Sequence, residues 1–175
     1  ADTVYVVLLN YRGWADTIDC LDSIFASRGV RFRVIVCDNA SGDGSLERIA
    51  AWAEGGLESR RPESPRLARL LGRVRRPLRL QRLDRVSAEA GASCAEAELV
   101  LVDNGANLGF AAGNNVGLRL AMAQPDMSHA WLLNNDTLVE PDCLAAMIDT
   151  LARHGDRAVC GSVIHFVDRP EVIQA

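Results

Sequence analysis

The sequence predicts an α/β protein of three layers, in which helices cover both faces of a mostly parallel sheet. Short, continuous apolar runs, typical of strands buried on both faces, alternate along the chain with segments of helical periodicity. Such alternation over 175 residues suits a single domain whose parallel strands are joined by helices. Hydrophobic residues make up 49% of the chain and charged residues 24%, the balance of a globular protein rather than a disordered one.

The first half of the chain contains two strand–helix pairs. Residues 4–9 form a continuous apolar run, and residues 15–28 place their apolar side chains on one helical face. Residues 32–37 predict the second strand and residues 45–53 the second helix, ahead of which Asp43 is available as a cap. Each pair therefore predicts a buried strand followed by an amphipathic helix.

The second half continues the pattern with three more strands. Residues 99–102 predict a third strand, followed by a third helix over residues 110–123. Residues 130–133 predict a fourth strand, and residues 141–154 a fourth helix whose first residue is a proline, as the first turn tolerates. Residues 158–166 resemble a fifth strand. The sequence thus predicts five strands and four helices.

Residues 55–98 interrupt this alternation. All 19 cationic residues of the chain are arginines, and ten of them fall between Arg60 and Arg85, among several prolines. We predict an insertion or long loop here, part of it mobile. Two interpretations stay open: a solvated basic loop, which such a composition favours, or a surface that contacts anionic lipid headgroups or a phosphorylated acceptor.

The composition excludes several classes of protein. A net charge of -4 gives no indication of nucleic-acid binding. The five cysteines are widely spaced and include no Cys-x-x-Cys pair, which argues against a disulfide framework or a structural zinc site and favours a reducing compartment. No apolar run approaches the ~20 residues of a membrane-spanning helix, and no signal peptide is recognisable. We therefore expect a cytoplasmic protein.

Short polar residues follow four of the predicted strands. Parallel sheets bind ligands beyond the carboxyl ends of their strands, so these exits are where a site is expected. The four polar segments are residues 10–13, 38–43, 103–109 and 134–137. Together they predict one polar cleft along one edge of the sheet.

Asp136 is the candidate metal ligand. It directly follows an apolar strand and precedes the proline-started helix. A carboxylate there can coordinate Mg²⁺ or Mn²⁺, which prefer oxygen ligands and keep positions for phosphates and water. The alternative is that Asp136 only caps a turn before Pro141, since aspartate is common in turns. The polar residues at the other strand exits favour the metal site.

Asp38 ends a buried strand in the same way. Its carboxylate could accept a hydrogen bond from the N3–H group of uracil or thymine, which purines do not offer in the same form. The competing explanation is turn formation ahead of the second helix, a role that fits Ser41 and Asp43. We favour recognition of the base for Asp38 and a turn or capping role for Asp43.

Three glycines recur every fourth residue at the start of the third helix. Tight packing of the helix on the sheet accounts for Gly113 and Gly117, because a residue without Cβ allows close approach. Gly109 lies at the entrance of the helix, where free N–H groups suit an anion. Asn107 and Asn115 are polar neighbours that could face a nucleotide.

Four motifs resemble those of the family 2 glycosyltransferases of the GT-A fold. Val6-Val7-Leu8-Leu9-Asn10-Tyr11 is the first, and the segment 132–137, which contains Asp136, is similar to the D-x-D-type metal motif of the family. The resemblance is closest to bacterial rhamnosyltransferase-like members. It covers most of the chain except the insertion. The other two segments that carry it are residues 38–45 and 107–117.

The resemblance implies a nucleotide-sugar-binding domain over residues 1–175 that stops before the acceptor-binding half. It implies that Asp136 binds Mg²⁺ or Mn²⁺ and that Asn134 lies near the ribose. Arg12 and Asn134 depart from the family pattern, which commonly has asparagine at the first position and an acid at the second. The expected substrate-binding residues are Asn10, Tyr11, Asp38, Asn107, Gly109, Asn115, Asn134 and Asn135.

The activity that the resemblance implies is metal-dependent, inverting transfer of a sugar from a dTDP- or UDP-sugar, with rhamnose favoured. The acceptor would be a glycan or a lipid-linked acceptor of polysaccharide biosynthesis, at the inner face of the membrane if the Arg60–Arg85 region contacts lipid. The catalytic base is expected beyond Ala175. One alternative is therefore a donor-binding or regulatory module without turnover. A nucleotidyltransferase is disfavoured because residues 11–14 lack the expected glycine-rich basic loop.

Overall fold

The computed structural model describes residues 2–60, 62–71, 74–155, 158–169 and 171–174. Its five strands form one sheet in the order β3-β4-β2-β1-β5. All four pairs of neighbouring strands are parallel, which confirms the predicted fold class and is consistent with a GT-A-like α/β fold. The strands are β1 (Thr3–Asn10), β2 (Phe32–Asp38), β3 (Leu80–Asp84), β4 (Leu99–Asp103) and β5 (Met127–Asn134).

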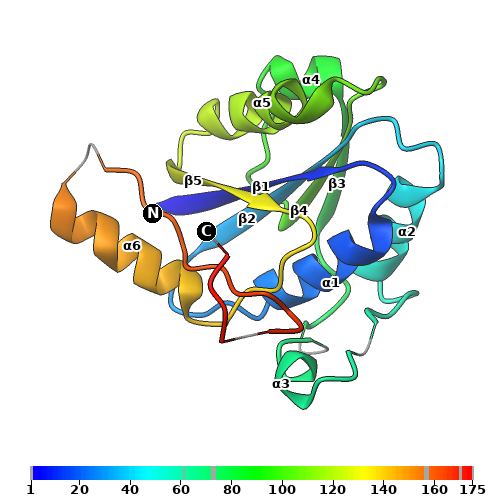
Figure 1. The fold of residues 1–175 in the computed structure, drawn as a ribbon. Helices are drawn as coiled ribbons and strands as arrows, with labels where there is room; N and C mark the ends of the chain where they lie inside the picture. Colours follow the sequence, from blue (N-terminus) through cyan, green and yellow to red (C-terminus); the bar gives the residue numbers. More distant parts are fainter. Residues whose placement is uncertain (1, 61, 72–73, 156–157, 170, 175) are drawn as a thin grey trace.

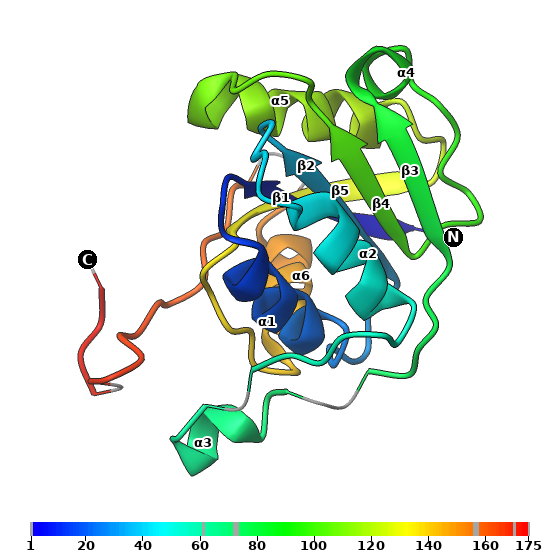
Figure 2. The ribbon, with the colours of Figure 1, turned by 90° about the vertical axis from the view of Figure 1, so that its right-hand side faces the viewer.

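Helices cover both faces of the sheet, as the two views in Figures 1 and 2 show. On one face lie α4 (Arg85–Glu89) and α5 (Gly109–Met122). On the other face lie α1 (Trp14–Ile24), α2 (Ser45–Ala53) and α6 (Cys143–His154). A four-residue helix, α3 (Pro65–Ala68), lies apart from the sheet. No helix of the described residues has both the length and the apolar character that crossing a bilayer requires.

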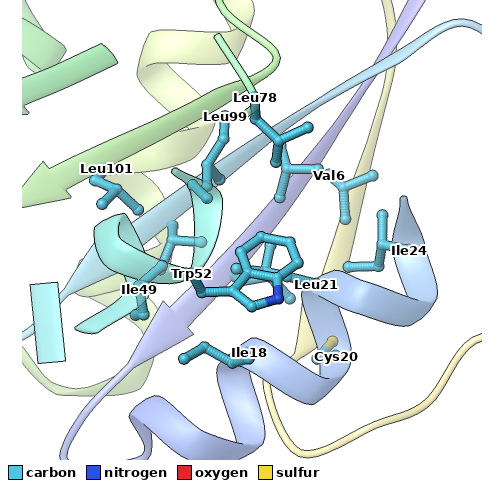
Figure 3. Packing of buried hydrophobic residues seen from close by; sticks show 14 of the residues in the cluster. Val6, Ile18, Cys20, Leu21, Ile24, Ile49, Trp52, Leu78, Leu99 and Leu101 are labelled. Carbon is cyan, nitrogen blue, oxygen red and sulfur yellow. The ribbon is translucent and has the colours of Figure 1, made fainter. Parts of the chain in front are cut away.

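Trp52 on α2 is a central residue of the core between the sheet and the helices α1 and α2 (Figure 3). Its side chain is fully buried and lies in one cluster with Ile18 and Leu21 from α1. Val6 and Leu101 join the cluster from the sheet. The apolar faces predicted for the first two helices therefore pack on the sheet. Because β1 and β2 are parallel, both strands end at the same edge of the sheet.

Helix α5 packs on the opposite face through two glycines. A Cβ atom at Gly117 would lie 2.6 Å from Val7 Cγ1 and 3.0 Å from Cys37 Sγ. A Cβ atom at Gly113 would lie 2.6 Å from Leu9 Cδ1 and 2.8 Å from Asn39 Oδ1. These distances confirm the packing role predicted for both glycines, and they bring the first turns of α5 close to the exits of β1 and β2.

Part of the predicted insertion belongs to the sheet. Residues 80–84 form β3, which pairs with β4 over five residues, and residues 85–89 form α4. The prediction of a long loop over residues 55–98 is therefore wrong for this part. The pattern of β3 is weak because it is an edge strand with polar and apolar residues mixed, so it lacks the apolar run of a strand buried on both faces.

The prediction of a strand over residues 158–166 is also wrong. This segment has no strand, and its one ladder contact is an isolated bridge between His165 and Ile173. Several of its apolar side chains lie in solvent, with Val159 fully exposed and Val163 66% exposed. β5 is the edge of the sheet on this side, so the segment adds no sixth strand to the sheet.

The arginines of the Arg60–Arg85 region are partly held by the protein itself. Arg60 binds the carboxylates of Asp16 and Asp19 on α1. Arg76 donates to Glu58 and to two backbone carbonyls, and its guanidinium carbon lies 5.6 Å from the centre of the Trp52 ring. Such contacts anchor the insertion to the domain. Arg61 and Arg73 lie outside the described residues.

A partly buried ion pair lies at the opposite edge of the sheet, where the strands begin. Arg33 Nη1 is 2.5 Å from Asp126 Oδ2 and donates to the hydroxyl of Tyr5 at 2.9 Å. Its other nitrogens donate to the carbonyls of Ala95 and Ala97. Burial alone would raise the pKa of Asp126, but the hydrogen bonds from Arg33, Tyr5 and Thr3 lower it to about 2. This cluster ties together the starts of β1, β2, β4 and β5.

Candidate functional site

The exits of the three central strands are aligned at one edge of the sheet. Asn10 pairs with Asp38 in the register of β1 and β2, and Asp38 pairs with Asp103 in the register of β2 and β4. On the other side of β1, Asn134 pairs with Leu9. The polar residues that follow the strands are therefore neighbours in space, as the sequence predicts for a parallel sheet.

A chain of hydrogen bonds connects the exits of β5, β1 and β2. The Asn135 side chain donates to Thr17 Oγ1 at 2.9 Å, and this hydroxyl donates to Asn10 Oδ1 at 2.9 Å. The Asn10 amide in turn donates to Asp38 Oδ1 at 2.5 Å. Asn10 is fully buried and Asp38 is 3% exposed. Both side chains therefore hold the strand ends together from within the protein.

The loops after β1 and β2 are joined by Ser41. Its backbone N–H and its hydroxyl donate to the two oxygens of Asp38, at 2.9 and 2.6 Å. The same hydroxyl accepts the backbone N–H of Arg12 at 2.9 Å. Arg12 and Ala40 adopt positive φ angles of 55° and 53°, which are uncommon for residues other than glycine. Such backbone strain is maintained only where surrounding contacts fix the conformation.

Replacing Asp38 with alanine is expected to lower the free energy of unfolding by about 2–3 kcal/mol, because buried donors of Asn10 and Ser41 would lose their acceptor. Urea unfolding followed by circular dichroism measures the change. Asp103→Ala is the control, because Asp103 occupies the paired position on β4 but is exposed. Equal stability of the two variants would contradict the internal role of Asp38.

The loop between β4 and α5 is held by asparagine side chains. Asn104 donates to Asn39 Oδ1 at 2.8 Å, and Asn39 Nδ2 donates to the carbonyl of Gly109 at 3.0 Å. The N–H of Gly109 donates to Asn107 Oδ1 at 2.9 Å. The sequence predicts a free N–H group here for an anion, but this N–H group is already engaged. Gly109 has a φ of 76° with open space around the Cβ position, so the backbone turn itself favours glycine here.

A cavity of about 270 Å³ lies among these loops. Tyr11 lines it after β1, and Asn107, Gly109 and Phe110 line it from the β4–α5 connection. The exit of β5 closes it with Leu133, Asn134 and Asn135, and Leu9 and Asn39 complete the lining. Its size suits a nucleoside, and its lining combines two aromatic rings with several amide groups.

A larger cavity of about 550 Å³ lies on the other side of the β5 exit. Leu133 and Asn134 line both cavities, so the two adjoin there rather than forming the single cleft that the sequence predicts. Asp136 lines the larger cavity and is exposed. The insertion contributes a wall through α3 and its neighbours, and residues 162–168 contribute another.

The surroundings of Asp136 suit a cation held mainly by a ligand. No hydrogen bond or ion pair engages its carboxylate among the described contacts, so both oxygens are available. The described residues contain no group of three or more His, Cys, Asp or Glu side chains that could hold a metal alone. Mg²⁺ is commonly bound by one or two carboxylates together with substrate phosphates and water. The donor set fits that kind of site.

The structure brings together five of the eight predicted substrate-binding residues around the smaller cavity: Tyr11, Asn107, Gly109, Asn134 and Asn135. Asn10 and Asp38 lie behind the cavity in the hydrogen-bond network, and Asn115 is exposed on α5 outside the lining. The sequence analysis missed Asn39, Thr17 and Phe110. Asn39 and Phe110 stand in the motifs already singled out, whereas nothing in the pattern indicates Thr17 on α1.

Cys37, next to Asp38, takes no part in the site. It is fully buried beneath α5, and burial raises the pKa of its thiol to about 12. A thiol that stays protonated in the core is not a nucleophile or a metal ligand.

Comparisons with known proteins agree with this architecture. The sequence model of glycosyl transferase family 2 matches residues 87–173. Uncharacterised proteins of Mycobacterium bovis and Mycobacterium tuberculosis are 50% identical to the chain over 46 residues. That stretch is 26% of this chain and 17% of each relative, so the match spans less than a fifth of the relatives. The matched residues 87–173 are just under half of the chain and include β4, α5, β5 and Asp136, so the match supports a relation of this segment to glycosyl transferase family 2.

Proposed function

We propose that this protein transfers a sugar from a nucleoside diphosphate sugar, with inversion, to a glycan or lipid-linked acceptor, and that Asp136 binds the required Mg²⁺ or Mn²⁺. One observation carries the proposal. A free carboxylate lines the larger of two adjoining cavities, two residues after the strand end that both cavities share, and the smaller cavity has the size of a nucleoside. The nucleoside would occupy the smaller cavity, the sugar and acceptor the larger, and the diphosphate the boundary between them.

Each part of the chain has a role in this arrangement. Asn134 lies at the boundary and Asn135 lines the smaller cavity beside it, where amide groups can donate hydrogen bonds to ribose or phosphate oxygens. Asp38, Asn10 and Ser41 fix the loop that carries Tyr11. When bound, the cation would neutralise charge on the departing nucleoside diphosphate. The sequence motifs favour uridine or thymidine as the nucleoside and rhamnose as the sugar.

Calorimetry with UDP tests the proposal. Mn²⁺ is expected to strengthen binding of UDP to the unchanged protein by about tenfold or more, equivalent to about 1.4 kcal/mol. Asp136→Asn is expected to abolish this enhancement and to leave metal-free binding of UDP unchanged, because it removes the charge of the ligand and keeps its shape.

The matched control is Asp103→Asn, another exposed carboxylate at a strand exit, which is expected to keep the full response to Mn²⁺. Binding of UDP that ignores Mn²⁺ in the unchanged protein, or an Asp136→Asn variant that still responds to it, would refute the assigned role of Asp136. Release of UDP from UDP-sugars and dTDP from dTDP-rhamnose, each measured with added acceptor glycans, then identifies the donor.

A further inference from the structure

Phe110 is an exposed aromatic residue that packing does not explain. Its side chain is 68% exposed, and none of the three apolar clusters of the core includes it. Its neighbour Leu108, by contrast, packs against the cluster beneath α5. An isolated exposed apolar residue needs no explanation by itself. Phe110 differs because it lines the smaller cavity.

Hydrogen bonds hold the backbone on which the ring of Phe110 is carried. Gly109, directly before it, donates its N–H to Asn107 Oδ1, and its carbonyl accepts a hydrogen bond from the Asn39 side chain. The carbonyl of Phe110 itself accepts a hydrogen bond from the Asn114 side chain at 2.9 Å. The position from which the ring projects is therefore fixed before any ligand binds.

A second exposed ring lines the same cavity. Tyr11 is 46% exposed, and the guanidinium carbon of Arg12 lies 5.2 Å from the centre of its ring. The backbone N–H and the side chain of Arg12 in turn donate hydrogen bonds to Ser41. Tyr11 comes from the exit of β1 and Phe110 from the start of α5, so two rings on separate elements share one small cavity.

This combination has a definite chemical complement. Aromatic side chains bind planar rings by stacking, with little dependence on the identity of the base. The amide of Asn107 adds a polar group, because its Oδ1 is engaged by Gly109 while no described contact occupies its Nδ2. A planar heterocycle with carbonyl groups on its edge satisfies both features.

We infer that Phe110 contacts the nucleobase of the donor and, together with Tyr11, forms the aromatic lining that holds the base in the smaller cavity. The inference rests on the proposed function, since it assigns the nucleoside to that cavity. It adds a residue that directly contacts the donor and is distinct from the residues that surround the diphosphate.

Two ligands separate contact with the base from contact with the diphosphate: UDP, and inorganic pyrophosphate, each with Mn²⁺. Phe110→Leu is expected to weaken binding of UDP about tenfold, within the range expected for one stacked base. It is expected to leave binding of pyrophosphate unchanged, because that ligand has no base. Phe110→Tyr keeps the ring and is expected to bind UDP within about twofold of the unchanged protein.

Met122→Ala is the matched control, since Met122 is 71% exposed at the other end of the same helix. It is expected to bind both ligands normally. Unchanged affinity of Phe110→Leu for UDP, or an equal loss for UDP and pyrophosphate, would overturn the inference while leaving the proposed function intact. If the unchanged protein binds pyrophosphate with Mn²⁺ but UDP no more tightly, both the nucleotide site and this inference are wrong.

Discussion

Replacing Arg33 with methionine is expected to lower the free energy of unfolding by about 3 kcal/mol, because it would leave a partly buried carboxylate without its partner. Arg33 is 6% exposed and donates hydrogen bonds to Asp126, to the Tyr5 hydroxyl and to two backbone carbonyls. Methionine fills much of the same space, so the loss is mainly electrostatic. Urea unfolding measures it, with Arg119→Met as the control for an exposed ion pair.

Arg119 is 58% exposed and lies 3.0 Å from Glu89, and breaking such a pair is expected to cost less than about 1 kcal/mol. The pH dependence gives a second check. The pKa of Asp126 is lowered to about 2, so its contribution to stability is complete above its ordinary value near 3.8 and is lost as the pH falls toward 2. The Arg33→Met variant should lose less stability over that range. Equal destabilisation by both substitutions would show that the buried cluster contributes little.

Replacing Gly117 with valine is expected to lower the free energy of unfolding by about 3 kcal/mol, at the upper end of the cost of overpacking a core. The first added carbon alone would lie 2.6 Å from Val7 and 3.0 Å from Cys37, in the contact between α5 and the sheet. Neither neighbour can move freely, because both are fully buried in central strands. Thermal unfolding by calorimetry measures the loss.

Ala112→Val is the control, since Ala112 is exposed on the same helix. It is expected to cost only about 0.5 kcal/mol, the difference in helix propensity. A Gly117→Val protein that unfolds at the same temperature as Ala112→Val would mean that α5 can shift away from the sheet without cost.

The sequence predicts those elements whose physical cause is local. The apolar runs of β1 and β2 mark strands buried on both faces, and the second helix, residues 45–53, has the predicted bounds. β3 has no such signal because its charged residues face solvent at the edge of the sheet. Residues 158–166 give the opposite error, since an apolar run becomes a strand only where it pairs with another strand.

The candidate site is predictable in position but not in the direction of each side chain. Parallel strands bring their exits together, so the polar residues after β1, β2, β4 and β5 could be expected at one edge. Which of them turn inward depends on contacts across the sheet. Asp38 satisfies buried donors of Asn10 and Ser41 instead of facing the cavity, and Thr17, far from any motif, joins the same network.

The edge position of β3 has a consequence for the behaviour of the protein at high concentration. An open strand edge is a template on which a second copy can add its own strand, leading to aggregation. β3 presents Arg82, which is exposed, and it is preceded by Arg79, which is 67% exposed. Two such edges meeting side by side would have to bury the charged side chains of Arg82 and Asp84, and the cost of that burial opposes the pairing.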